Sequence, residues 1–316
     1  GAATWYWAPR ASGETGPMHV VLIAPSPTSA PVVAALVEGL LARDESTAVD
    51  VVVATAEDVT ALGLRVSATS DAVLDALAGR PEPVGTTVQD GLRETGSGPG
   101  WLELPDTAVA THLARSAWLA RGATPSEVLA RLCEAAGLPD RVRVRPVTDV
   151  PVETHVVLDV PDGEAPQSAV HVREWREGLG GQPTPARVVV AGLDRAPAAP
   201  GVLDAVRSAD AVVVAPGDPV LQVGPVLGVP GMSDALRGTS ADVVVLDPRL
   251  GPGTALVGLE VAGLPATGPA AAGIYRDIAD VWVTPVPETG YARALRVVPT
   301  AAATPFALAA EVLALL

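Results

Sequence analysis

Cysteine is nearly absent from this 316-residue sequence, which contains Cys133 alone. One cysteine cannot form a disulfide within the chain, and Cys133 stands in an amphipathic helical pattern. We therefore expect a buried structural thiol at this position in preference to a nucleophile. Four scattered histidines with one cysteine also cannot make a standard structural zinc site.

Lysine is missing altogether, and 36 acidic residues against 21 basic ones give a formal net charge of −15. This charge argues against nucleic acid and anionic membranes as partners, because proteins bind both mainly by neutralising phosphate groups. A small phosphorylated ligand is compatible with the composition only if positive charge is supplied locally. Arginines, backbone N–H groups, helix N-termini or a divalent metal are the available sources.

Aromatic residues make up only 3% of the chain, so valine, alanine and leucine must fill its core. The 48% of hydrophobic and 18% of charged residues are typical of a folded globular protein. No apolar run of about twenty residues escapes proline, glycine or charge, and the first residues lack the pattern of a secretory signal. We expect a soluble, cytoplasmic protein.

Short apolar, β-branched runs alternate with helical patterns along most of the chain. Nearly continuous apolar strands separated by helices are typical of a parallel sheet with both faces covered. The sequence therefore predicts an α/β fold with a Rossmann-like, mostly parallel sheet. The expected strands are His19 to Ala24, Val49 to Ala54, His155 to Val160, Arg187 to Gly192, Ala211 to Pro216, Asp242 to Asp247 and Val281 to Pro285.

One region has a purely helical pattern and is expected to form an inserted helical subdomain over residues 101–144. Its second helix should begin with Thr124 as N-cap, Pro125 as first helical residue and Glu127 completing a capping box. The α/β core then comprises residues 18–100 and 145–316, and residues 1–17 are interpreted as an extension.

In the segment "ADAVVVAPGDPVLQVGPVLGVPG", an expected buried strand ends in a loop of alanine, proline, glycine and aspartate, residues 215–219. Loops that follow the strands of a parallel sheet are where such folds bind ligands. We therefore predict that Ala215, Gly217, Asp218 and Gly224 contribute to phosphate recognition.

Acidic residues follow the second expected strand. Glu57 and Asp58 lie in the loop after it, and Asp71 opens the next helical run. Carboxylates from neighbouring loops suit Mg²⁺, which proteins hold with one or two carboxylates plus waters and substrate phosphates. The alternative is that these are solvated acids that cap helices.

Polar groups on the insertion and on a later strand are further candidates. His112, Arg115 and Ser116 share one helix face by their spacing, and Thr111 precedes them. His155 begins the strand "ETHVVLDV". These groups either meet a phosphate or a polar ring edge, or serve as partly buried structural residues.

No convincing hydrolase elbow or Walker loop is present, and covalent catalysis therefore has no obvious nucleophile. This pattern favours a reaction in which the substrate supplies the attacking hydroxyl, while the protein supplies position and charge neutralisation. Phosphoryl transfer is a reaction of this kind.

Several ordered segments, "DTAVATHLARSAWLARG", "ETHVVLDV", "HVREW" and "ADAVVVAPGDPVLQVGPVLGVPGMSDALR", resemble the CofD family. This family comprises the 2-phospho-L-lactate transferases of deazaflavin coenzyme F-420 biosynthesis, called FbiA in actinobacteria. The resemblance runs from about Met18 to the last strands.

The resemblance implies transfer of a phospholactyl or phosphoenolpyruvyl group from a guanosine diphospho donor to the deazaflavin Fo, with release of GMP. It also implies Mg²⁺ held by acidic residues. The family's Asp-Asp pair falls on Glu57 and Asp58 and its later metal-binding Asp on Asp71, so Glu57 and Asp71 are the expected metal ligands. Thr111, His112, Arg115 and His155 would line the cleft beside the helical insertion, and the family implies a homodimer.

The sequence departs from the family pattern in three loops. The family's glycine-rich first loop is "LIAPSPTSAP" here, and its prolines remove backbone N–H donors. The family's Ser-Asn is Gly217-Asp218, which would turn a carboxylate toward a diphosphate. Arg249 stands where the family has a lysine-containing region. These departures support an alternative function, a catalytically impaired, YvcK-like protein that binds a nucleotide or deazaflavin without turnover.

Overall fold

A seven-stranded parallel sheet lies at the centre of this computed structural model, which describes residues 17–159, 167–251 and 256–316. The five inner strands are rich in valine and buried on both faces, as the continuous apolar runs predicted, whereas the two edge strands are partly exposed. The strand order is β12 (Arg296–Pro299), β11 (Val281–Thr284), β10 (Asp242–Leu246), β9 (Ala211–Val214), β1 (His19–Ala24), β2 (Ala48–Val53) and β5 (Val142–Pro146).

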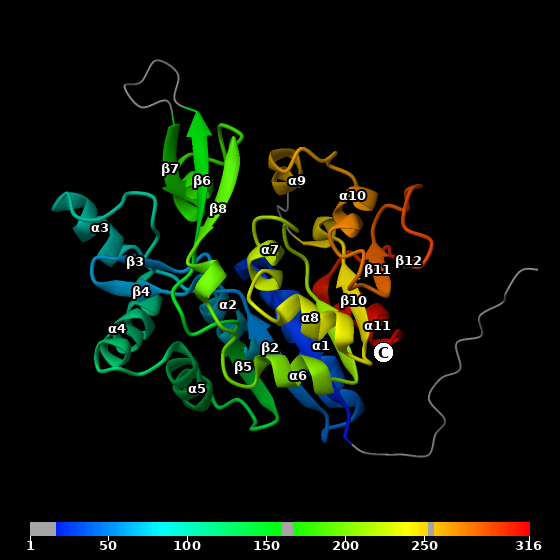
Figure 1. Cartoon of the computed structure of the whole chain (residues 1–316). Helices are drawn as coiled ribbons and strands as arrows, with labels where there is room; N and C mark the ends of the chain where they lie inside the picture. Colours follow the sequence, from blue (N-terminus) through cyan, green and yellow to red (C-terminus); the bar gives the residue numbers. More distant parts are fainter. Residues whose placement is uncertain (1–16, 160–166, 252–255) are drawn as a thin grey trace, which may run out of the picture.

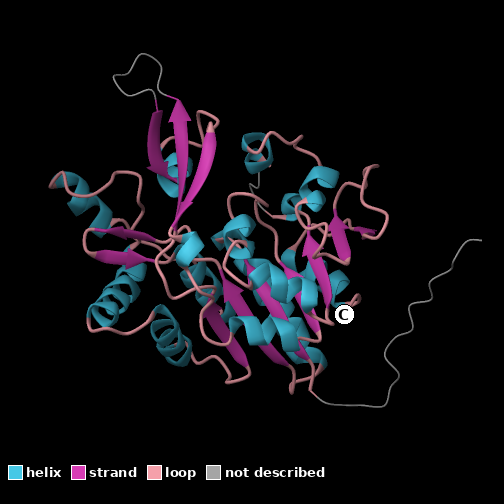
Figure 2. Cartoon of the chain, viewed as in Figure 1, coloured by secondary structure: helices cyan, strands magenta, loops and turns pink. Residues whose placement is uncertain are grey.

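Helices cover both faces of this sheet, so the predicted α/β class is confirmed (Figures 1 and 2). The helices that pack on one face are α1 (Ala30–Arg43), α2 (Ala68–Leu77) and α11 (Pro305–Leu313). Those on the other face are α6 (Val202–Ser208), α7 (Val223–Leu227), α8 (Met232–Gly238), α9 (Val257–Val261) and α10 (Gly268–Gly273).

A separate three-stranded antiparallel sheet corrects one prediction. The runs that begin at His155 and Arg187 were expected to join the main sheet, but they pair with each other outside it (Figure 1). This sheet has the order β7 (Gln167–His171), β6 (Glu153–Asp159) and β8 (Arg187–Ala191). A π-helical turn, Glu174–Gly178, follows β7.

The helical insertion contains α4 (Asp106–Ala120) and α5 (Pro125–Ala135). The expected capping box is present, because the Thr124 hydroxyl accepts from the Glu127 amide and the Glu127 carboxylate accepts from the Thr124 amide. The insertion ends earlier than expected, since β5 joins the main sheet from Val142 onward. Beside the insertion lie α3 (Thr87–Glu94) and the hairpin of β3 (Val59–Ala61) and β4 (Leu64–Val66).

Most of the predicted N-terminal extension lies outside the described residues. Of the predicted extension, residues 1–17, only Pro17 falls within the described residues.

Cys133 is half-buried, and burial raises the pKa of its thiol, which agrees with a structural role. Across the described part of the chain, no helix combines the length and apolar character needed to cross a membrane.

Candidate functional site

The loop after β2 carries the predicted acids into the protein interior. Glu57 and Asp58 are 4% and 6% exposed, so the alternative of solvated helix caps is wrong for both. Two backbone hydrogen bonds fix this loop: the Asp58 amide donates to the Thr55 carbonyl, and the Thr154 amide donates to the Ala56 carbonyl. The second bond attaches the small sheet to the carboxyl edge of the main one.

Glu57 forms a two-pronged ion pair with Arg176 from the π-helical turn. Its two carboxylate oxygens lie 2.6 and 2.9 Å from the guanidinium nitrogens, and Gln222 Nε2 lies 3.3 Å away. Burial would raise the pKa of Glu57, but the charge and hydrogen bonds of Arg176 outweigh burial and lower it. Glu57 is therefore ionised and already neutralised by a protein cation.

Asp58 has weaker partners. Ser67 Oγ donates to it at 2.7 Å, and the nearest Arg65 nitrogen is 3.5 Å away. Burial raises the pKa of Asp58 to about 6, against the opposing effects of Arg65, Ser67 and Arg115, and the neighbouring charge of Asp71 adds to the rise. A carboxylate destabilised in this way would gain from an added cation.

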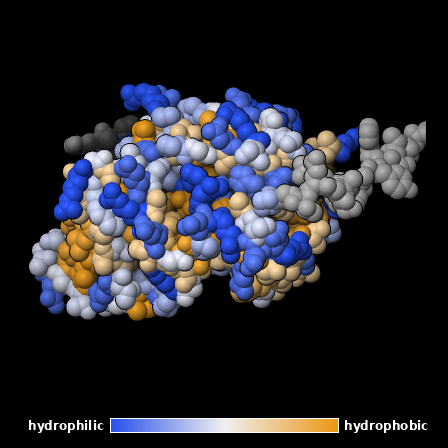
Figure 3. Space-filling view, turned by 90° about the horizontal axis from the view of Figure 1, so that it is seen from below, coloured by the Kyte–Doolittle hydropathy of each residue, from blue (hydrophilic) through white to orange (hydrophobic). Residues whose placement is uncertain are grey.

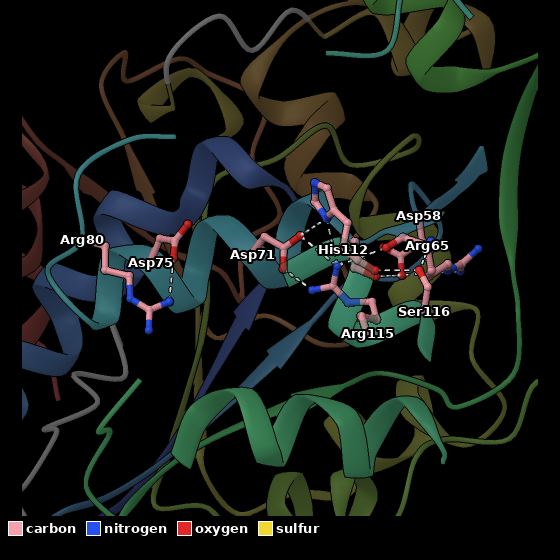
Figure 4. Close-up of polar contacts among 9 residues, drawn as sticks. Asp58, Arg65, Asp71, Asp75, Arg80, His112, Arg115 and Ser116 are labelled. Carbon is pink, nitrogen blue, oxygen red and sulfur yellow. Dashed lines mark hydrogen bonds and ion pairs between the residues drawn. The ribbon is translucent and has the colours of Figure 1, made fainter. Parts of the chain in front are cut away.

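Asp71, on the first turn of α2, meets two side chains of α4 (Figure 4). Arg115 donates to both carboxylate oxygens, and His112 Nδ1 lies 3.6 Å from one of them. Burial lowers the pKa of His112. The structure thus brings together His112, Arg115 and Asp71, three residues that the sequence proposed from two distant segments. Thr111 is half-buried on the same helix.

Glu57 and Asp71, the two expected metal ligands, pair with two different arginines. The described residues contain no group of three or more His, Cys, Asp or Glu side chains that could hold a metal ion. Mg²⁺ needs only one or two carboxylates when waters and substrate oxygens complete its shell. Of the three acids, Asp58 is the one without a bidentate arginine, whereas Arg115 donates to both oxygens of Asp71.

The small sheet supplies a second cluster. His155 of β6 lies opposite His171 of β7, with the rings edge to face at 5.6 Å, and its Nε2 is 3.8 Å from Glu153. Burial, followed by the charge of His155, lowers the pKa of His171 to about 4. Arg173 pairs with Glu177 through Nε and Nη2, whereas its buried Nη1 has no partner among the described residues.

His171, Arg173 and Arg176 were not among the predicted site residues. The sequence did contain a signal, because all three lie in or directly after "HVREW", a segment that carried the family resemblance. Periodicity could not identify them, since the segment folds as a strand end followed by a π-helical turn.

The loop after β9 is closely packed. The Ala215 amide donates to Ile23 O, and a Cβ atom added to Gly217 would lie 2.5 Å from Pro25 Cγ. Gly224 approaches the Pro219 carbonyl in the same manner, with 3.3 Å to a built Cβ. The space beside Gly217 is therefore filled by the proline of the first loop.

Asp218 does not face a ligand position, which corrects the expectation drawn from the sequence. Its carboxylate accepts from the backbone amides of Val220, Leu221 and Gly258 at 2.8 to 2.9 Å. Burial raises the pKa of Asp218, and these backbone hydrogen bonds oppose the rise. Its role in this structure is to join the β9 loop to the start of α9.

Arg249, considered as a substitute for the family's lysine, is also held within the protein. Asp247 lies 2.6 Å from its Nη2 and Glu288 lies 3.3 Å from it. These two carboxylates raise the pKa of Arg249. The guanidinium is consequently committed to a local ion-pair network at the carboxyl ends of β10 and β11.

A cavity of about 380 Å³ opens between the β2 loop, the β3–β4 hairpin and the helices α4 and α5. One wall is apolar, formed mainly by the two insertion helices and by prolines. The other end is polar and includes Asp58 and Arg115. The lining residues are Thr55, Asp58, Thr60, Gly63, Arg65, Ser67, Ser70, Arg115, Ser116, Leu119, Pro125, Val128, Leu129, Leu132, Pro146, Thr148, Asp149, Val150 and Pro151.

Comparisons with known proteins agree with this architecture. A crystal structure of a UPF0052 family member from Bacillus halodurans superposes with a TM-score of 0.59 at 13% identity, over 94% of this chain and 99% of that one. This likeness shows the shared fold.

Curated relatives are closer in sequence. The phosphoenolpyruvate transferase of Streptomyces griseus subsp. griseus is 34% identical over 249 residues, which is 75% of this chain and 77% of the relative. That of Thermobifida fusca is 36% identical over 242 residues, 72% of this chain and 73% of the relative. The family model described as 2-phospho-L-lactate transferase CofD matches residues 32–298, and the chain therefore belongs to the CofD family.

Proposed function

We propose that this protein transfers a phospholactyl or phosphoenolpyruvyl group from a guanosine diphospho donor to the deazaflavin Fo in coenzyme F-420 biosynthesis. The observation that carries the proposal is the cavity between the β2 loop and the insertion helices. In a CofD-family chain, this cavity combines an apolar wall with an acidic and arginine-bearing end.

The cavity suits the acceptor. A planar deazaflavin ring would lie against the apolar wall that includes Leu119, Leu129 and Leu132, where burial of its faces drives binding. Its ribityl chain would then extend toward Asp58 and Arg115, so that the hydroxyl to be modified reaches the carboxyl edge of the sheet.

The donor would approach the same edge from the small sheet. Arg173 carries the one arginine N–H group found buried and unpartnered in the described chain, and an anionic group of the donor would satisfy it. In the reaction, the acceptor hydroxyl oxygen bonds to the phosphorus that carries the lactyl or enolpyruvyl group through an ester oxygen, while the bond from that phosphorus to the GMP phosphate oxygen breaks. GMP leaves with the electron pair, and the hydroxyl proton is lost to a nearby base or water.

Asp58 and Asp71 would hold Mg²⁺ together with donor oxygens, and the ion would supply charge neutralisation for the departing phosphate. Arg115 keeps Asp71 in position from the neighbouring helix. Glu57 has a different role in this proposal: its ion pair with Arg176 fixes the π-helical turn that carries Arg173.

A matched pair of variants on α2 tests the proposal. Asp71→Asn should lower GMP release by roughly 100-fold or more when protein, Fo, donor and Mg²⁺ are mixed. Asp75→Asn, one turn further along the helix, removes a carboxylate that pairs with Arg80 and should leave the rate unchanged (Figure 4). Chromatography of GMP and of the acceptor that carries the transferred group gives the rate for each variant, and equal rates in the two variants would contradict the proposal.

A second function, ligand binding without turnover, is favoured by one observation. Pro25 occupies the space beside Gly217, and Asp218 is saturated by backbone amides, so the β9 loop offers a nucleotide fewer free groups. Thermal denaturation separates the two functions. A ligand at a hundred times its dissociation constant adds about 2.7 kcal/mol of stability, so stabilisation by Fo or GDP without GMP release would identify a binding protein.

A further inference from the structure

The hydroxyl group of Thr55 is buried at the edge of the cavity without a hydrogen-bond partner. Thr55 follows β2 by two residues, is 6% exposed and belongs to the cavity lining. Among the cavity-lining residues, it is the one with a buried side-chain oxygen that lacks a partner in the described structure. An unpaired buried hydroxyl costs free energy, so its presence calls for an explanation.

Another threonine of the cavity shows the usual arrangement. Thr148 Oγ1 donates to the Pro197 carbonyl at 2.7 Å and accepts from the Val150 amide at 3.1 Å. The Thr148 hydroxyl therefore already donates one hydrogen bond and accepts another, whereas the Thr55 hydroxyl does neither.

The threonine side chain has a simple means of presenting its hydroxyl to a ligand. Rotation about its Cα–Cβ bond moves the hydroxyl between staggered positions, one of which the methyl group occupies now. A ligand that offers a hydrogen-bonding group in the cavity would favour the rotamer that points the hydroxyl at it, because only this rotamer removes the desolvation cost.

The position of Thr55 indicates which part of a ligand it meets. The Asp58 amide donates to the Thr55 carbonyl at 3.1 Å, so Thr55 lies next to Asp58 in the lining of the cavity. A polyhydroxylated chain reaching from the apolar wall to Asp58 would pass this residue.

We propose that Thr55 is a specificity residue for the acceptor, and that its hydroxyl hydrogen-bonds to a hydroxyl group of the acceptor's polyol chain. This proposal rests on the proposed function, since it assumes that the cavity receives a ring bearing such a chain.

Thr154 provides a matched control. Its hydroxyl is also buried and unpartnered, but it lies on β6 and is not part of the cavity lining. Replacing either threonine by valine exchanges an unsatisfied hydroxyl for a methyl group of similar shape. We therefore expect both variants to unfold at the same urea concentration as the parent protein or a higher one.

Only Thr55→Val should impair binding. Titration calorimetry with Fo should show a dissociation constant raised roughly fivefold to tenfold for Thr55→Val, the value of one neutral hydrogen bond. Thr154→Val and Thr55→Ser should bind Fo as the parent does. A deazaflavin ring without the ribityl chain should bind the parent and Thr55→Val equally. Should Thr55→Val not fold, Thr55→Ala, which also lacks the hydroxyl, takes its place.

The outcomes distinguish the two proposals. If the parent binds Fo and Thr55→Val binds it equally well, the role of Thr55 is overturned while the proposed function stands. A loss for Thr55→Val that extends to the ring without its chain would also overturn it. If the folded parent does not bind Fo at all, the proposed acceptor fails, and the role of Thr55 fails with it.

Discussion

At the scale of single residues, arginine is the cation that pairs with the acidic side chains of the candidate site. Several buried or half-buried carboxylates have an arginine partner, including the pairs Glu57–Arg176, Asp71–Arg115 and Asp247–Arg249. The planar guanidinium can contact both oxygens of a carboxylate, which an ammonium group does less well. In this lysine-free chain, the forked pairs Glu57–Arg176 and Asp71–Arg115 join segments that are distant in sequence at the candidate site.

Close packing at Gly217 gives a prediction for one residue. The Cβ atom in Gly217→Ala would overlap the buried Pro25 ring, so the variant should lose about 1 to 3 kcal/mol of unfolding free energy. Pro25→Ala removes the Cγ atom that causes the closest overlap. The cost of Gly217→Ala should accordingly be smaller in the Pro25→Ala background.

Urea unfolding of the parent, the two single variants and the double variant measures this coupling. Strictly additive costs would show that the first loop and the β9 loop do not restrict each other, contrary to the packing described here.

Elements that sequence patterns assign to the right type can still belong to the wrong sheet. The runs at β6 and β8 are strands, as predicted, yet they form an antiparallel sheet with β7. The run "RVVVA" of β8 is apolar in sequence but partly exposed in the structure. The local sequence pattern indicates that a segment forms a strand, whereas its partner strand is decided by contacts between residues far apart in the chain.

In the main sheet, a charge network around the buried Asp50 links β1, β2 and β5. Asp50, with a side chain 1% exposed, accepts from His19 at 2.8 Å, Arg143 at 2.9 Å and Arg145 at 2.7 Å. Burial would raise the pKa of Asp50, but the hydrogen bonds from His19 and Arg145 and the charges of both arginines lower it from 3.8 to about 2.

This network predicts a specific pH dependence of stability. Because the folded-state pKa of Asp50 is lowered, its ionised form contributes about 2 kcal/mol above pH 4, and this contribution is lost as the pH falls from about 4 to 2. Asp50→Asn should be less stable than the parent at pH 7, and the difference should shrink over the same interval. Urea unfolding at a series of pH values gives this difference, and a constant difference from pH 7 to pH 2 would refute the assignment.

At the scale of the whole molecule, the C-terminal segment has two different faces. Leu308, Val312 and Leu313 are buried in the core cluster with α1, whereas Phe306 is 64% exposed. One face of this apolar segment is therefore part of the core. The surface seen from below is a mosaic of hydrophilic and hydrophobic residues (Figure 3).

The homodimer expected from the sequence remains a prediction, and the exposed Phe306 ring provides a way to test it. Sedimentation equilibrium should give a mass twice the chain mass of 31.9 kDa. Phe306→Glu should shift the mass toward one chain if the exposed face of α11 forms the contact, because a buried unpaired charge opposes association. A parent protein that sediments at 31.9 kDa over the working concentration range would exclude the dimer.

The sequence by itself determined the fold class and the two helices of the insertion with their capping box. It also placed acidic residues in the loop after β2 and placed His112 and Arg115 on one helix face. These features follow from local patterns, since apolar periodicity, capping residues and loop position are written over a few neighbouring residues. Only the tertiary structure decided which carboxylate meets which arginine, that Asp218 faces backbone amides, and that Thr55 lies unpartnered beside a cavity. Such pairings depend on the distances between segments separated by tens to hundreds of residues, and the local pattern of a chain does not encode them.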